Sequence, residues 1–250
     1  MISHSHLTIP NWKAPSNVVA FTTQIGGGFS DNEYCSLNLG LHVNDNRQTV
    51  LKNRLQLPYS NSIHWLEQTH SDISISLPST RVDADASFTE HADIACAVMT
   101  ADCLPILVTD KTGARVSAIH AGWQGLATRI IAKTIERAFA GYSSEDLLVW
   151  IGPSIQQCHY EVDEALTERF KHYSDIFKPS TNKSKYMLDL VAVAKQQVHQ
   201  LGINNVFSSG ECTYCEKNKY FSFRRSSHQG FSNCGRMVSI IMKQNSLANA

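Results

Sequence analysis

Blocks of apolar and polar residues along the chain predict an irregular succession of strands and helices. Apolar spacing of about 3.6 residues predicts helices over 46–55, 126–142, 160–173 and 188–201. Apolar or alternating runs predict strands over 17–23, 62–71, 94–99, 104–109, 116–119, 147–151, 205–209, 219–223 and 236–242. Because these elements do not alternate as regular βαβ units, we expect a mixed α+β sandwich. It would be a single domain over residues 1–250, with residues 1–15 as a mobile tail.

The run TADCLPILVTDKTGARVSAIHAGWQG, residues 100–125, predicts a hairpin with polar chemistry at its open end. Its two apolar strands are separated by the polar tetrapeptide 110–113, which ends in glycine. If residues 110 and 113 close the loop, Cys103 and His120 face each other with Cβ atoms about 5.5 Å apart. The helix predicted next would direct its first free amides toward the same place, which favours an anion there.

A thiol and an imidazole at that distance have three interpretations. They can bind one metal ion, they can act as nucleophile and base, or they can be a buried cysteine beside a hydrogen-bonded core histidine. The carboxylate of Asp102 before the cysteine and the glycine-rich turn 121–125 after the histidine favour a functional site.

His70 provides a third candidate ligand beside Cys103 and His120. Two imidazoles and one thiolate suit Zn²⁺, which keeps a fourth position for water when it is catalytic. On the predicted strand 62–71, Gln68 and His70 point to one face. Gln68 and Asp102 are therefore candidate substrate contacts or supports of the ligands, with a purely structural role as the alternative.

Composition narrows the classes of function. The 250 residues contain 22 basic and 22 acidic side chains, and this balance argues against nucleic-acid and membrane partners. The sequence has no signal peptide and no apolar run of about 20 residues. Since its seven cysteines are an odd number, we expect reduced thiols in a cytoplasmic protein.

The other cysteines offer weaker signals. Cys212 and Cys215 form one CxxC pair, whereas a zinc ribbon needs a second pair. Cys158 and Cys234 each stand alone in the sequence. We therefore interpret these four cysteines as structural or incidental.

Two arginines near the C-terminus are candidate anion ligands. Arg224 and Arg236 lie close to predicted apolar strands, where they could hold a phosphate or carboxylate by bidentate hydrogen bonds. Solvated surface arginines are the alternative interpretation.

The motifs QTHS, TADCLPILVTD and VSAIHAGWQGL, followed by GPSI, CHYEV, CTYC and FSFRR, resemble the laccase-domain (YfiH) family of purine nucleoside phosphorylases. The resemblance covers nearly the whole chain in the family's motif order. It implies a single α+β domain, similar in fold to a toxin deamidase, and a zinc site made by His70, Cys103 and His120. It also implies phosphorolysis of adenosine, inosine, guanosine and methylthioadenosine, together with adenosine deamination. Purine nucleosides and inorganic phosphate are then the expected partners.

This chain departs from the family pattern at two positions. Gln24 stands where the family often has arginine, and Cys234 stands where threonine precedes the final Gly-Arg. If that arginine binds phosphate, Gln24 weakens the case for a phosphorylase specifically.

Four alternatives to the nucleoside enzyme stay open. A polyphenol oxidase is disfavoured, and copper with it, because multicopper sites need several closely spaced histidines and the only HxH is His4–His6. A thiol hydrolase would use Cys103 as nucleophile and His120 as base. A third candidate is a hydrolase that removes serine from a nucleotide-linked muramic acid precursor of the cell wall. The fourth is a protein that binds nucleosides without turning them over.

Overall fold

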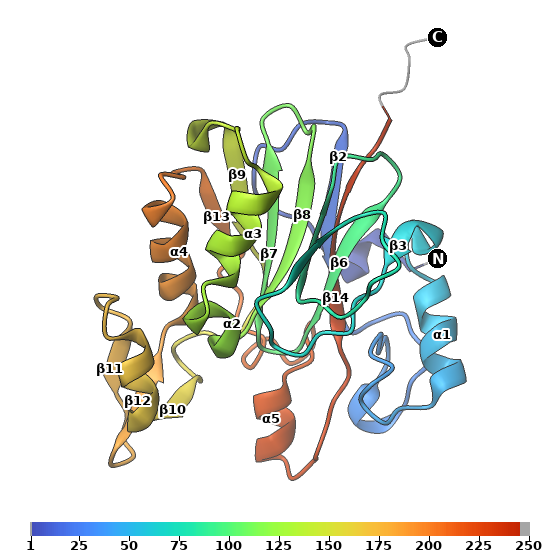
Figure 1. The fold of residues 1–250 in the computed structure, drawn as a ribbon. Helices are drawn as coiled ribbons and strands as arrows, with labels where there is room; N and C mark the ends of the chain where they lie inside the picture. The colour runs from blue at the N-terminus through green and yellow to red at the C-terminus, as the bar shows by residue number, and fades with distance from the viewer. Residues whose placement is uncertain (1, 246–250) are drawn as a thin grey trace.

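The computed structural model describes residues 2–245, and within this range the strands form three sheets (Figure 1). The five-stranded sheet has the order β1 Leu7–Thr8, β2 Val18–Thr23, β14 Met237–Lys243, β6 Ala95–Thr100 and β3 Ile63–His64. The six-stranded sheet has the order β13 Val206–Ser208, β9 Leu147–Ile151, β7 Leu104–Asp110, β8 Val116–Ala121, β5 Ala86–Thr89 and β4 Ser74–Ser76. The three-stranded sheet has the order β10 Glu161–Asp163, β12 Lys185–Leu188 and β11 Phe177–Pro179.

Helices flank the two large sheets. The α-helices of the described residues are α1 Arg47–Leu55, α2 Trp123–Ala127, α3 Ile130–Ala138, α4 Leu190–Gln200 and α5 Phe223–His228. The 3₁₀ helices are η1 His4–His6, η2 Asn32–Tyr34, η3 Ser60–Ser62, η4 Ser144–Asp146 and η5 Glu164–Phe170. Figure 1 shows α2, α3 and α4 on one side of the sandwich and α1 on the opposite side. None of the helices in residues 2–245 combines the length and apolar character needed to cross a lipid bilayer.

The core is layered, and the expected mixed α+β sandwich is confirmed. Between the two large sheets, Cys96, Val98 and Ile241 of one sheet pack with Leu107, Ala118 and Trp150 of the other. The next residues along the same strands point the other way, and those of the six-stranded sheet pack against Ile131 and Ile135 of α3 and Val193 and Val198 of α4. Strands buried on both faces need continuous apolar runs, which is why 94–99 and 104–109 contain so few polar residues.

The predicted hairpin exists, but its predicted register is wrong. Thr109 pairs with Val116 and Pro105 pairs with His120, so Cys103 precedes the strand instead of facing His120. The loop is longer than four residues because the Asp110 carboxylate accepts hydrogen bonds from the amides of Thr112 at 2.8 Å and Arg115 at 2.9 Å. A buried aspartate thus holds the wider turn.

The predicted strand 62–71 is also largely wrong, because only Ile63–His64 is a strand. The Gln68 side chain bonds the edge of β6 in place of the backbone, donating to the Met99 carbonyl at 2.8 Å and accepting from the Met99 amide at 2.7 Å. His70 has a left-handed backbone with φ 60°. Gln68 and His70 therefore do not share a strand face.

Several other elements differ from the expectation. The helix predicted over 126–142 breaks into α2 and α3 at Arg129, which has φ 62°. Buried Gln197 donates to the Leu126 carbonyl at 2.7 Å and so helps to end α2. The helix predicted over 160–173 is wrong, since β10 and η5 occupy that range. The strand predicted over 219–223 is wrong as well, because Ser222 caps α5 by accepting from the Arg225 amide.

The N-terminal segment differs from the expected mobile tail. Residues His4–His6 form η1, and β1 pairs antiparallel with β2 at Leu7 and Thr8. Ile2 and Leu7 are buried in the core on the outer face of the five-stranded sheet. The remaining predicted elements, over 17–23, 46–55, 94–99, 147–151, 188–201, 205–209 and 236–242, are confirmed within one or two residues.

Candidate metal and substrate site

A cavity of about 500 Å³ opens where β7 begins and β8 ends. This volume falls in the range of about 300–1,000 Å³ that is usual for small-molecule sites. The cavity is lined by all seven site residues expected from the sequence: Gln68, His70, Asp102, Cys103, His120, Arg224 and Arg236. Residues from five separate segments of the chain therefore meet in one place.

The donor atoms of His70, Cys103 and His120 all lie within 4.8 Å of one another. His70 Nε2 is 3.8 Å from Cys103 Sγ, and the two imidazole rings meet edge to face with centroids 4.8 Å apart. Gly122 makes room for this arrangement, since a Cβ atom there would lie 3.0 Å from both Cys103 Sγ and His70 Cδ2. The close approach explains the glycine that follows the His120 strand.

Asp85, which sequence reasoning missed, organises two of the three donors. Its fully buried carboxylate accepts from His120 Nδ1 at 2.8 Å. It also accepts from the amides of Thr69 at 3.2 Å, His70 at 3.1 Å and Ser71 at 2.6 Å. Because Nδ1 of His120 is engaged, Nε2 is left as its donor atom, the arrangement by which carboxylates commonly orient metal-binding histidines. The sequence signal for Asp85 was only its position directly before the short strand β5, Ala86–Thr89.

Charge coupling between the donors shifts their pKa values. Burial opposes ionisation of Cys103, but the neighbouring His120 and His70 lower the pKa of its thiol to about 6. Burial likewise opposes protonation of His120, yet Cys103 and Asp85 raise its pKa. For Asp85, hydrogen bonds from His120 and Ser71 outweigh burial and lower the pKa to about 2. The metal-free site therefore holds the Cys103 thiolate beside the His120 imidazolium. A thiolate is a good nucleophile and a good metal ligand.

The side chains of Asp102 and Gln68 line the cavity and are both hydrogen-bonded within the protein. The Asp102 carboxylate accepts from the Thr213 hydroxyl at 2.6 Å and from the Arg224 amide at 2.7 Å. Asp102 also has a left-handed backbone, with φ 95°, directly before Cys103. Such strained backbone persists only where the surroundings hold it, and it is frequent at functional sites. With the Gln68 amide bonded to Met99, both side chains fix the walls of the cavity.

Two guanidinium groups give the cavity a positive wall. Arg224 Nη1 donates to the Glu161 carbonyl at 3.0 Å, and Arg236 Nη1 donates to the Cys234 carbonyl at 2.8 Å. His42 lines the same cavity, and burial together with Arg236 and Arg54 lowers its pKa. A positive potential at this wall suits an anion such as phosphate.

Gln24 and Cys234, the two positions that depart from the family pattern, do not line this cavity. Gln24 is not among the lining residues, and its amide donates to the Thr8 hydroxyl at 3.3 Å. Cys234 is buried behind Arg236, whose Nη1 lies 3.4 Å from its sulfur.

The sequence of this chain is similar to known proteins along most of its length. A family model described as multi-copper polyphenol oxidoreductase laccase matches residues 18–244. A Haemophilus influenzae protein named purine nucleoside phosphorylase is 38% identical over 243 residues, which cover 93% of this chain and 97% of that protein. The Escherichia coli K12 protein named purine nucleoside phosphorylase YfiH is 35% identical over 246 residues, covering 95% and 98%.

Two solved structures superpose on this chain over nearly its whole length. A Neisseria meningitidis protein superposes with a TM-score of 0.86 at 34% identity, covering 96% of this chain and 100% of that one. YlmD from Geobacillus stearothermophilus superposes with a TM-score of 0.87 at 27% identity, covering 98% of each chain.

Replacement of Asp85 should weaken metal binding at the candidate site. In Asp85→Asn the charge that orients His120 is lost, and the new amide cannot accept from all of its present donors. We expect zinc affinity, measured by competition with a chromogenic chelator, to fall about 10–100-fold. Asp83→Asn is the matched control, because Asp83 is exposed and pairs with Arg81. Equal zinc affinity in both variants would contradict the role given to Asp85.

The coupled pKa values predict an unusually reactive thiol in metal-free protein. Alkylation of Cys103 by iodoacetamide, followed by peptide mapping, should reach half its maximal rate near pH 6 and decline below it as the thiolate is protonated. Buried Cys96, whose pKa is raised to about 12, should stay unmodified. A half-maximal rate near the ordinary thiol value of about 8.5 would contradict the predicted ion pair. Added zinc should protect Cys103.

Proposed function

The chain belongs to the multi-copper polyphenol oxidoreductase laccase family, and on that premise we propose that it is a zinc-dependent purine nucleoside enzyme. It cleaves adenosine, inosine, guanosine and methylthioadenosine with inorganic phosphate, and it deaminates adenosine. The relatives named purine nucleoside phosphorylase, at 35–38% identity over almost the full chain, support the phosphorylase class.

One observation carries the proposal: two imidazoles and one thiolate converge on a cavity of nucleoside size that also has a positive wall. Three protein donors beside an open space match the donor sets of catalytic zinc sites, whereas structural zinc sites are closed by four. A zinc ion held by His70, Cys103 and His120 would polarise a substrate oxygen or activate water at neutral pH.

The chain's own residues supply binding and orientation. Trp123, Ile155 and Phe223 give the cavity apolar walls on which a purine can pack. The guanidinium groups of Arg224 and Arg236 hold phosphate for attack on the ribose anomeric carbon. Tyr160 also lines the cavity, and burial raises the pKa of its phenol, so it stays protonated and can donate a hydrogen bond to the leaving purine.

Zinc suits the donor set better than the copper implied by the family's description. Multicopper oxidation needs several mutually close histidines, and the described residues offer only two in this group. His4 and His6 lie on η1 and belong to neither group of close donors found in residues 2–245. We place the reaction in the cytoplasm, because a thiolate ligand and seven free cysteines suit a reducing compartment.

A second cavity favours one alternative, hydrolysis of a nucleotide-linked muramoyl-serine precursor. This cavity of about 540 Å³ shares His42, Gln68 and Met99 with the first. It also contains Arg47 and Arg54, and the Arg54 guanidinium lies 3.6 Å over the Trp65 ring. A substrate larger than a nucleoside could occupy both cavities, with its charged groups beside these cations.

Product analysis separates these activities. Metal-quantified protein is given adenosine with and without phosphate, and separately the muramoyl-serine precursor. We expect phosphate-dependent adenine and some inosine, because the site offers both phosphate and water access to the substrate. No nucleoside product together with released serine would overturn the proposal in favour of the hydrolase.

The matched control for that assay is the variant Cys103→Ala purified in the same way. Loss of one donor should abolish both adenine and inosine formation and reduce bound zinc. Full turnover by a variant that has lost its metal from this site would contradict the mechanism.

The positive wall predicts a specific effect on phosphate. Arg236→Gln removes a charge-assisted hydrogen bond worth about 1.5–3 kcal/mol, so the KM for phosphate should rise at least about tenfold. The rate of adenosine deamination, which needs no phosphate, should change much less. Arg169→Gln serves as the control, because Arg169 is an exposed residue of η5 and does not line the cavity. Equal losses in both reactions would argue against a phosphate role for Arg236.

A further inference from the structure

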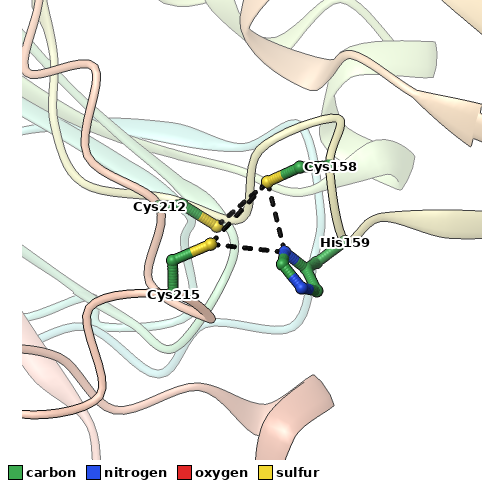
Figure 2. Close-up of side chains that lie close together, drawn as sticks. All are labelled: Cys158, His159, Cys212 and Cys215. Carbon is green, nitrogen blue, oxygen red and sulfur yellow. Dashed lines mark hydrogen bonds between the residues drawn. The ribbon is translucent and has the colours of Figure 1, made fainter.

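A second group of close donors lies outside the catalytic cavity. Figure 2 shows Cys158, His159, Cys212 and Cys215 with their side chains turned toward one point. Their donor atoms all lie within 4.8 Å of one another. Cys158 stands alone in the sequence, but the folded chain brings the dipeptide 158–159 against the CxxC pair.

The spacing of the donors matches a tetrahedral zinc site. Zn–S bonds of about 2.3 Å separate two sulfur ligands by about 3.8 Å, and a Zn–N bond of about 2.0 Å separates sulfur from nitrogen by about 3.5 Å. Cys158 Sγ lies 3.8 Å from the sulfurs of both Cys212 and Cys215. His159 Nδ1 lies 3.2 Å from Cys158 Sγ and 3.3 Å from Cys215 Sγ. The four donors therefore surround a space that one metal ion would fill.

Two neighbouring loops present these donors. The first follows β9, where the amides of His159 and Tyr160 donate to the Gln156 carbonyl and wind the chain into a turn. The second is joined to the first by a bridge between Ser154 and Cys212. The Tyr214 ring stacks on His159 with centroids 4.1 Å apart, and its hydroxyl lies 3.1 Å from His228 Nδ1. The imidazole is thus packed in the orientation that directs Nδ1 toward the sulfurs.

We propose that Cys158, His159, Cys212 and Cys215 bind one Zn²⁺ as a closed, structural site that is separate from the catalytic cavity. Three thiols lose their protons to solvent on binding, and neutral His159 contributes Nδ1. Four protein donors leave no position for substrate, in contrast to the three donors of the cavity. The ion holds the loop after β9 against the loop 211–216.

This site supports the floor of the catalytic cavity. Thr213, between the two ligands of the CxxC pair, donates its hydroxyl to Asp102, the neighbour of Cys103. On the other loop, Arg224 Nη1 donates to the carbonyls of His159 at 3.3 Å and Glu161 at 3.0 Å. Tyr160, which lines the cavity, directly follows His159. Zinc at the second site therefore fixes the backbone that carries Tyr160 and anchors Arg224.

A disulfide is the main competing explanation for clustered cysteines. The sulfur separations of 3.8 Å are far longer than a covalent bond of about 2.05 Å, and all three cysteines are free in the structure. A disulfide would also leave the third thiol and the adjacent imidazole without a role. The metal accounts for all four side chains together.

Metal counting by mass spectrometry tests the proposal on the full chain purified without added chelator. We expect two zinc ions per chain in the wild type, one in Cys215→Ser and one in Cys103→Ala. His159→Cys should keep two, because a thiolate replaces the imidazole in a four-donor site. Cys35→Ser, which alters an exposed cysteine outside both groups, should also keep two.

Cys215→Ser could lose zinc because it misfolds, so a second measurement uses a variant in which all four donors of the second site are intact. Cobalt-loaded Cys103→Ala should show strong thiolate-to-cobalt charge-transfer absorption from the three remaining thiolates. Absence of that absorption would overturn the proposal. So would an unchanged zinc content in Cys215→Ser, or a disulfide among residues 158, 212 and 215 in the wild type.

Discussion

The candidate site depends on the hydrogen bonds that the buried carboxylate of Asp85 accepts. One side chain accepts hydrogen bonds from the backbone amides of residues 69–71 and from the imidazole of His120. It therefore bends the chain that carries His70 and orients the His120 ring at the same time. A buried carboxylate is costly unless it is fully hydrogen-bonded. Here that requirement fixes the geometry of the donors.

The sandwich serves the site by bringing distant segments to one end. Cys103 precedes β7 and His120 ends β8, so their separation is set by the hairpin, while Asp102 ties the same corner to Thr213 and Arg224. An open group of three donors and a closed group of four then lie on either side of this corner. We propose that the first performs chemistry and the second keeps the loops in place. The oxidase name of the family does not match this division of donors.

Much of the fold could be predicted from the sequence, because strands buried on both faces and helices with one apolar face leave clear periodic patterns. Side chains that replace backbone hydrogen bonds leave no such pattern. Asp110 widened the hairpin loop and shifted its register, and Gln68 prevented a strand from forming beside β6. The seven candidate site residues could be named from local motifs, and the fold brings them to one cavity. Asp85 and the partnership of Cys158 with Cys215 were missed, because each depends on contacts between segments far apart in sequence.

A crystal structure with anomalous diffraction measured on both sides of the zinc absorption edge tests the central claim most directly. The account predicts a zinc peak bounded by His70 Nε2, Cys103 Sγ and His120 Nε2, with its fourth position facing the cavity. Crystals soaked with a purine nucleoside should show the base against the apolar wall beside that peak. Enzyme that turns over nucleosides but has no metal among these three donors would contradict the account.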